Sequence, residues 1–66
     1  MIGENLLSLR KGRKLSQEQV AEAVGVSRQA VAKWESGEAL PDLMNCAALA
    51  KLYDVTLDEL VSFDSA

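Results

Sequence analysis

The chain has 66 residues, one cysteine, no histidine and a formal net charge of −3. This length predicts one domain, and its composition excludes both an internal disulfide and a Cys/His metal cluster. The sequence shows neither a secretion signal nor the apolar run of roughly 20 residues that a membrane helix needs. A lone thiol without a secretion signal indicates the reducing cytoplasm. We therefore expect an all-α domain that needs no cofactor and makes no membrane contact.

The charges are divided unevenly along the chain. Residues 1–33 contain six basic and three acidic side chains, whereas residues 34–66 contain one lysine and seven acids. A chain divided in this way can present a basic face although its net charge is negative. The acidic total therefore does not exclude nucleic acid as a partner.

Apolar spacing and end signals predict the first two helices. Apolar residues three and four positions apart predict a helix from Ile2 to about Lys11, which Gly12 ends. The sequence S-Q-E-Q, beginning at Ser16, is a capping box that starts a second helix. Gly25 stands where the left-handed residue after a helix is expected.

Three further helices follow. Ser27 is expected to cap a third helix that Gly37 ends, and Pro41 fits the first turn of a fourth helix. Thr56 opens a second capping box, T-L-D-E, and starts a short fifth helix. The fifth helix contains Leu57, Leu60 and Val61. The side chains expected on the buried side of the fourth helix are Leu43, Cys46, Ala47, Leu49, Ala50 and Tyr53.

The third helix has two different faces. At 100° per residue, Val31 and Trp34 lie on one side, which favours a core role for the tryptophan. Gln29 and Lys33 lie opposite, with Arg28 at the flank. Arginine, glutamine and lysine are the side chains that hydrogen-bond base edges in a DNA groove. A solvated face without a partner is the alternative interpretation.

The stretch SQEQVAEAVGVSRQAVAKWESGEALP resembles the Cro/phage-repressor-like helix-turn-helix family of bacterial and phage regulators. The markers of the resemblance are Arg10, Ser16, Gln17, Val20, Ala21, Gly25, Val26, Ser27, Val31, Trp34, Glu35, Gly37, Pro41, Leu49, Ala50, Leu57 and Leu60. The resemblance covers nearly the whole chain. It implies a compact five-helix, lambda-repressor-like domain with a helix-turn-helix at about residues 16–36. It also implies a regulator of transcription, by family habit a repressor, whose third helix lies in the major groove of double-stranded DNA.

The resemblance assigns base reading to Arg28, Gln29 and Lys33, with Ala32 against a thymine methyl group. Arginine suits the two guanine acceptors and glutamine suits adenine, while lysine suits either a guanine or a phosphate. The family pattern also pairs Glu35 with Arg10, in a partly buried ion pair that joins the first helix to the third.

Contacts to phosphates are expected to flank the base readers. Gln17 is the first candidate, because its backbone amide and its side chain both lie at a helix N-terminus. For Ser27, capping of the third helix is an equally favoured role. For the basic candidates Arg13 and Lys14, the alternative is a solvated loop without a partner. Glu38 stands where the family often has a basic residue, which weakens phosphate contact there. The remaining phosphate candidates are Ser27, Ser36, Arg13 and Lys14.

The sequence favours other functions less than DNA binding. An enzyme is the least favoured class, since the sequence has no histidine and no phosphate-cradling glycine-rich loop. No pocket for a small-molecule inducer is evident. The serious alternative is a protein-interaction module of antitoxin or anti-repressor type on the same fold.

A homodimer on a palindromic operator is expected, because one helix reads only about four to six base pairs. Leu60, Val61 and Phe63 are the expected dimer contacts, although they can equally close the core. The chain stops soon after the fifth helix, so it can also be the first part of a longer protein.

Overall fold

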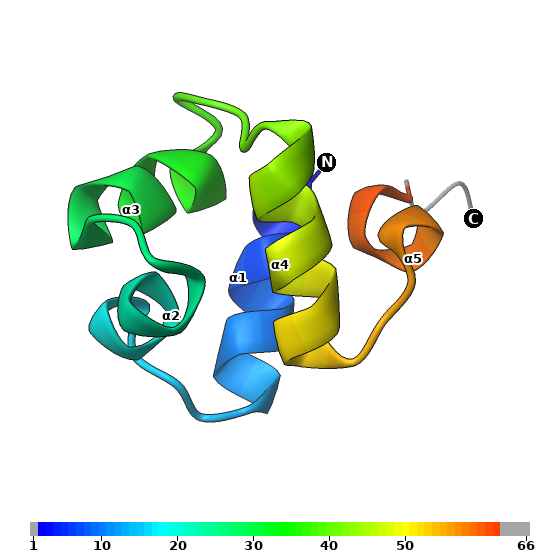
Figure 1. The fold of residues 1–66 in the computed structure, drawn as a ribbon, viewed down its shortest axis with the longest axis horizontal. Helices are drawn as coiled ribbons and strands as arrows, with labels where there is room; N and C mark the ends of the chain where they lie inside the picture. The colour runs from blue at the N-terminus through cyan, green and yellow to red at the C-terminus, as the bar shows by residue number, and fades with distance from the viewer. Residues whose placement is uncertain (1, 63–66) are drawn as a thin grey trace.

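The computed structural model describes residues 2–62, which form five α-helices (Figure 1). Within this range there is no strand, and no helix has the length and apolar character to cross a membrane. This confirms the predicted five-helix, all-α fold. The helices are α1 (Ile2–Gly12), α2 (Gln17–Val24), α3 (Arg28–Ser36), α4 (Leu43–Tyr53) and α5 (Leu57–Val61).

The helix ends follow the predicted signals closely. At the start of α2, the Gln19 amide donates to the Ser16 hydroxyl, and the Gln19 side chain accepts from the Ser16 amide. Thr56 heads a second complete capping box at α5, and Ser27 caps α3. Gly25 ends α2 in the left-handed region, at a φ of 87° that few other residues adopt without strain.

The start of α4 differs from the prediction. Pro41 does not lie in the first turn, because Asp42 caps the helix by accepting the Asn45 amide at 2.8 Å. Pro41 precedes this cap and is buried, and its carbonyl accepts a hydrogen bond from the Cys46 thiol at 3.6 Å. An aspartate carboxylate satisfies a first-turn amide, which a proline side chain cannot do, so the helix begins at Leu43, after Pro41 and not at it. Burial also raises the pKa of the Cys46 thiol, in agreement with a core role.

The core collects apolar side chains from every helix. Trp34 is 5% exposed, which confirms its expected core role. The buried set consists of Leu6, Val20, Ala21, Val31, Trp34, Cys46, Leu49, Ala50, Tyr53 and Leu60.

Several apolar residues expected in the core lie at the surface instead. Leu43 is 73% exposed, and Ala47 is exposed as well, so both predictions are wrong. On α5, for which no buried side was predicted, Leu57 and Val61 are 42% and 37% exposed. The helical spacing of Leu43 fits the buried face, but Leu43 is the first residue of α4, and helical side chains tilt towards the N-terminus, so it extends past the start of the helix, whereas Cys46 one turn later is buried.

The arrangement of the helices leaves one face of α3 open. α3 packs against α1 and α2, while α5 packs against α1 and α4 (Figure 1). In the view of Figure 1, α2 and α3 therefore form one end of the molecule and α5 the other. The surface of α3 that points away from α1 and α2 is exposed at Arg28, Gln29, Lys33 and Ser36.

Candidate nucleic-acid interface

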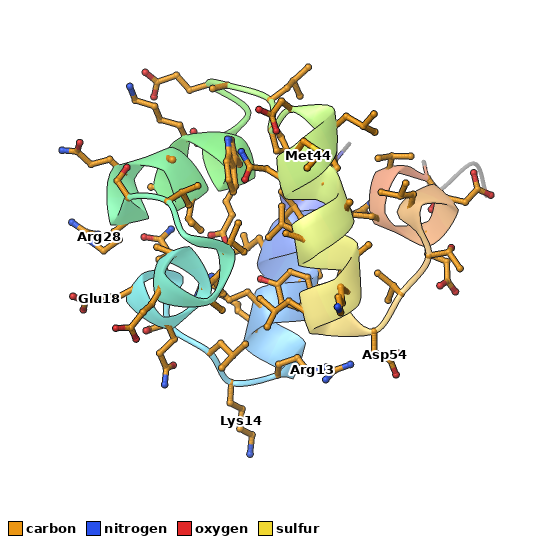
Figure 2. All side chains as sticks on the ribbon, viewed as in Figure 1. Arg13, Lys14, Glu18, Arg28, Met44 and Asp54 are labelled. Carbon is orange, nitrogen blue, oxygen red and sulfur yellow. The ribbon has the colours of Figure 1, made fainter. Side chains whose placement is uncertain are left out.

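The uncovered face of α3 carries the polar residues predicted to read bases. Arg28, Gln29 and Lys33 are all exposed, and Ala32 beside them is partly buried. Arg28 points away from the molecule at its outer edge (Figure 2). Because Val31 and Trp34 on the opposite face are buried, the core fixes the orientation of the helix.

None of these three polar side chains is engaged within the described part of the chain. Arg28, Gln29 and Lys33 form no side-chain hydrogen bond and no ion pair with residues 2–62. Their donors and acceptors are therefore available to a partner without the loss of any internal contact. A set of free polar groups on a rigid helix is what direct reading of base edges requires.

A shallow depression lies at the N-terminus of α2, next to the start of α3. The Ser16 cap satisfies the Gln19 amide, which leaves the amides of Gln17 and Glu18 without an acceptor in their own helix. These amides and the helix dipole favour an anion. The side chains lining the depression are Arg10, Ser16, Gln17, Glu18 and Arg28.

The Glu18 carboxylate lowers the affinity of this depression for anions. Figure 2 shows Glu18 and Arg28 at the same outer edge of the molecule, one from each helix of the helix-turn-helix. Like charges repel, so a phosphate placed here is attracted by the two arginines and repelled by Glu18.

One carboxylate joins the elements that frame this depression. Glu35 accepts from the Arg10 Nε at 2.7 Å and Nη2 at 3.1 Å, and from the Gln17 Nε2 at 3.0 Å. The Arg10 Nη1 also donates to the Leu15 carbonyl at 2.9 Å. The contact expected between Arg10 and Glu35 is therefore present, and it extends to the first residue of α2. One amide hydrogen of Gln17 is used here, so the backbone amide is the freer group for a phosphate.

Burial of this network perturbs the ionisation of its neighbours. The hydrogen bond to Glu35 raises the pKa of the Arg10 guanidinium above its ordinary value, and burial offsets this only in part. Burial raises the pKa of Tyr53 to about 12, with a further increase from the Glu35 charge and an opposing effect of Arg10. Arg10 therefore keeps its charge wherever the domain is folded.

The two serines predicted to contact phosphates differ in whether their hydroxyl hydrogens are already used in hydrogen bonds. The Ser27 oxygen accepts the Ala30 amide at 3.1 Å, so its hydroxyl hydrogen remains free for a phosphate. The Ser36 hydroxyl donates to the Lys33 carbonyl at 3.1 Å and accepts from the Glu38 amide at 3.3 Å. A phosphate contact at Ser36 therefore requires the loss of an existing bond, whereas one at Ser27 does not.

Arg13 and Lys14 diverge although they are adjacent. The Arg13 Nη2 donates to the Tyr53 carbonyl at 2.6 Å, near the end of α4. Lys14 has a left-handed φ of 58°, and in Figure 2 its side chain points into solvent away from Arg13. Arg13 thus has a structural partner that the sequence did not reveal, and it lies apart from Arg28 in the same view.

The dimer surface expected on α5 is not available as a whole. Leu60 is fully buried, because α5 turns it towards α1 and α4, so this part of the prediction is wrong. Val61 is 37% exposed, and Phe63 lies outside the described residues. Among residues 2–62, Val61 is therefore the one member of the expected contact that is exposed.

Two residues near the N-terminus make contacts that the sequence did not reveal, Gly3 with α3 and Asn5 with the end of α5. The backbone of Gly3 lies so close to α3 that an added Cβ would stand 2.7 Å from the Trp34 carbonyl oxygen and 2.8 Å from that of Glu35. Asn5 donates to the carbonyls of Leu60 and Ser62, at 3.1 and 2.7 Å. A glycine within a predicted helix, such as Gly3, indicates a close approach of another segment. No local pattern in the sequence indicates the hydrogen bonds of Asn5.

Comparison with known proteins identifies the family. The model of the helix-turn-helix family matches residues 6–60. The chain is a member of the helix-turn-helix family. Among helix-turn-helix proteins, it is 48% identical over 59 residues to the transcriptional activator BcrR of Enterococcus faecalis, which covers 89% of this chain and 29% of BcrR. It is 37% identical over 59 residues to the CTXphi transcriptional repressor RstR of Vibrio cholerae, covering 89% of this chain and 53% of RstR.

Solved helix-turn-helix structures have the same fold. The P22 c2 repressor in complex with a synthetic operator superposes with a TM-score of 0.91 at 34% identity, covering 97% of both chains. The restriction-modification controller protein C.AhdI of Aeromonas hydrophila has a TM-score of 0.84 at 36% identity, covering 89% of both chains.

The chain matches only part of these curated relatives, since it spans 29% of BcrR and 53% of RstR. The family and the fold are therefore those of the DNA-binding portion that the proteins share. Within residues 2–62, no group of three or more metal-binding side chains gathers to form a further site.

Proposed function

We propose that this helix-turn-helix domain binds a specific sequence of double-stranded DNA and regulates transcription, with α3 in the major groove. The observation that carries this proposal is the exposed face of α3. It presents three polar side chains with no internal partner on a helix that the core holds rigidly. The P22 c2 repressor, which has the same fold, was solved in complex with an operator.

In this proposal each of four residues of α3 makes its own contact with the DNA. Arg28 contacts a guanine through both of its acceptors, and Gln29 contacts an adenine in the same way. Lys33 contacts a guanine or a phosphate one turn later, and Ala32 packs against a thymine methyl group.

Phosphates on either side fix the register of α3. The backbone amide of Gln17, at the start of α2, and the free hydroxyl hydrogen of Ser27, at the start of α3, are the best-placed donors. Of the two basic candidates, Lys14 is the more available for a phosphate, because Arg13 already donates to the Tyr53 carbonyl.

We further propose that two copies bind a palindromic operator and that binding represses transcription. One short recognition helix contacts too few base pairs to select a site in a genome, and two copies related by a two-fold axis double the number read. RstR and P22 c2 are named as repressors, which favours repression, although BcrR is named as an activator.

Selection of bound sequences from a random DNA pool tests the proposal. The expected result is an enriched, inverted-repeat consensus with half-sites about one helical turn apart. Absence of any enrichment overturns the proposal. A reporter with the selected sequence across its promoter then separates repression, seen as lower expression, from activation.

The dependence of binding on salt separates DNA reading from a protein-interaction module. Each phosphate contact releases counterions, so affinity should fall roughly tenfold or more between 50 and 200 mM salt. If the chain binds DNA weakly and without this dependence, its acidic residues 34–66 become the better candidate for a functional surface.

A further inference from the structure

A carboxylate without a partner lies near a guanidinium without a partner where α2 meets α3. Glu18 and Arg28 line the same depression, and Figure 2 shows both at one outer edge of the molecule. Both side chains are exposed, and within residues 2–62 neither forms a side-chain hydrogen bond or an ion pair. The dipole of α2 favours an acid in its first turn, but nothing in the fold requires this acid beside the arginine that is proposed to read a base.

Among the described residues that line the depression, Arg28 is the cation with a free guanidinium. Arg10 lines it as well, but its guanidinium already donates to the Glu35 carboxylate and to the Leu15 carbonyl. Arg28 has no such partner and is the first residue of α3. Its side chain can therefore turn either into the major groove or towards a phosphate of the DNA backbone.

The two acceptors that DNA offers to Arg28 differ in charge. Guanine presents two uncharged acceptors in the major groove, whereas each phosphate carries a negative charge. A contact with a phosphate carries no sequence information, so an arginine bound there does not discriminate between bases. The Glu18 carboxylate repels a phosphate at this edge of the molecule far more than it repels an uncharged base. It therefore disfavours the contact that would make Arg28 indifferent to sequence.

We propose that Glu18 is a specificity determinant that keeps Arg28 from the phosphate backbone, so that Arg28 binds strongly only where a guanine is present. This inference rests on the proposed function and adds to it a residue that reads no base itself. Glu18 weakens binding to DNA in general, and it weakens binding most where the guanine is missing. It thereby raises the ratio of specific to non-specific affinity, which decides the site that a regulator occupies in a genome.

The test measures how well the protein distinguishes two single half-site duplexes. The Arg28 position is the base pair of the selected sequence at which Arg28→Ala loses its preference, and the changed duplex carries another base pair there. The discrimination ratio is the affinity for the selected duplex divided by the affinity for the changed duplex. For the parent chain we expect a ratio of roughly ten to a hundred. Glu18→Gln should lower this ratio about two- to fivefold, mainly by raising the affinity for the changed duplex.

Two controls show whether the effect is local and whether it acts through Arg28. Glu22→Gln removes the same charge from an exposed position one turn later on α2, outside the depression, and should leave the discrimination ratio unchanged. When Arg28→Ala is already present, Glu18→Gln should raise the affinity for the changed duplex by less, because no guanidinium is left to bind the phosphate. Both duplexes are bound by the same protein, so a change in its folded fraction cancels from the ratio.

The dependence of binding on salt gives a further readout that a purely structural role of Glu18 would not alter. The slope of log affinity against log salt measures the number of phosphates that the protein neutralises. In Glu18→Gln, this slope should become steeper by about 0.9 on the changed duplex, the value of one added phosphate contact, and should change less on the selected duplex.

The outcomes separate this inference from the proposed function. Absence of DNA binding by the parent chain overturns both. If the parent chain binds but Arg28→Ala keeps every preference, or Glu18→Gln keeps the parent ratio, the inference alone is overturned. It is also overturned if Glu22→Gln lowers the ratio equally, or if the gain on the changed duplex is as large without Arg28. A relaxed choice at a different base pair in Glu18→Gln would make Glu18 a base reader and would overturn the inference as well.

Discussion

Arg10 on α1 holds Glu35 on α3 through two hydrogen bonds, Nε to Oε2 at 2.7 Å and Nη2 to Oε1 at 3.1 Å. The two side chains are only 14% and 5% exposed, so water replaces little of the interaction if one partner is lost. Gln17 donates to the same carboxylate at 3.0 Å, which brings α2 into the network. The relative position of both helices of the helix-turn-helix therefore depends on one glutamate.

Removal of either partner of this pair should destabilise the fold. Arg10→Ala or Glu35→Ala leaves an uncompensated charge in a mostly buried site, and we expect a loss of about 3–5 kcal/mol in the free energy of unfolding. Urea denaturation monitored by circular dichroism measures the loss. Arg28→Ala is the control, since Arg28 is exposed and has no internal partner. Parent-like stability of both pair variants would show that the contact contributes nothing to the fold.

Gly3→Ala should destabilise the domain although alanine favours helices. The new Cβ would lie 2.7 and 2.8 Å from two backbone oxygens of α3, which cannot move aside as a flexible side chain can. Overpacking of this kind costs about 1–3 kcal/mol. Gly12→Ala in the same helix is the matched control, because nothing lies within 4 Å of its new Cβ and the substitution should be neutral or stabilising. Equal stabilities of the two variants would contradict the close approach of α1 to α3.

Stability should decline at high pH because of Tyr53. Its pKa rises from 10.0 to about 12 on folding, so between these values the native state keeps a proton that the unfolded chain has lost. The stabilisation is present in full below pH 10 and disappears as the pH approaches 12, for a total of about 2–3 kcal/mol. The difference in the free energy of unfolding between the parent chain and Tyr53→Phe, measured from pH 10 to 12, isolates the effect of Tyr53 from that of other titrating groups. A difference that does not change with pH would contradict the raised pKa of Tyr53.

Gln29→Ala should relax the choice of base at one position of the half-site. Loss of a bidentate contact to adenine costs about 1–3 kcal/mol of discrimination, while overall stability stays unchanged because the side chain is exposed. Repeating the random-pool selection with the variant measures the change position by position. Lys14→Ala is the contrast, since loss of a phosphate contact weakens binding to all sequences alike. An unaltered consensus for Gln29→Ala would remove this residue from the base readers.

The sequence predicted local features well because they depend on near neighbours. Both capping boxes and the left-handed Gly25 arise from side chains within a few residues of the backbone groups that they satisfy. The separation of Trp34 from Gln29 on α3 follows equally from helical periodicity.

The misses depended on where one helix ends relative to another. Leu43 has the spacing of a buried residue, but it is the first residue of α4 and is exposed, whereas Cys46 one turn later is buried. Leu60 has the spacing of either a surface or a core residue, and the packing of α5 decided in favour of the core. The bond from Arg13 to the Tyr53 carbonyl joins residues 40 positions apart, and no local pattern indicates such a contact.

The two hydrogen bonds of Asn5 determine how this domain can be joined to other molecules. By holding the carbonyls of Leu60 and Ser62 against α1, Asn5 makes the chain leave α5 from a fixed point. That point lies across α1 and α4 from the helix-turn-helix (Figure 1). A fluorophore, an affinity tag or a surface tether attached at Ser62 is thus attached on the side of the molecule opposite the recognition helix. Immobilised measurements on this domain can therefore use C-terminal attachment.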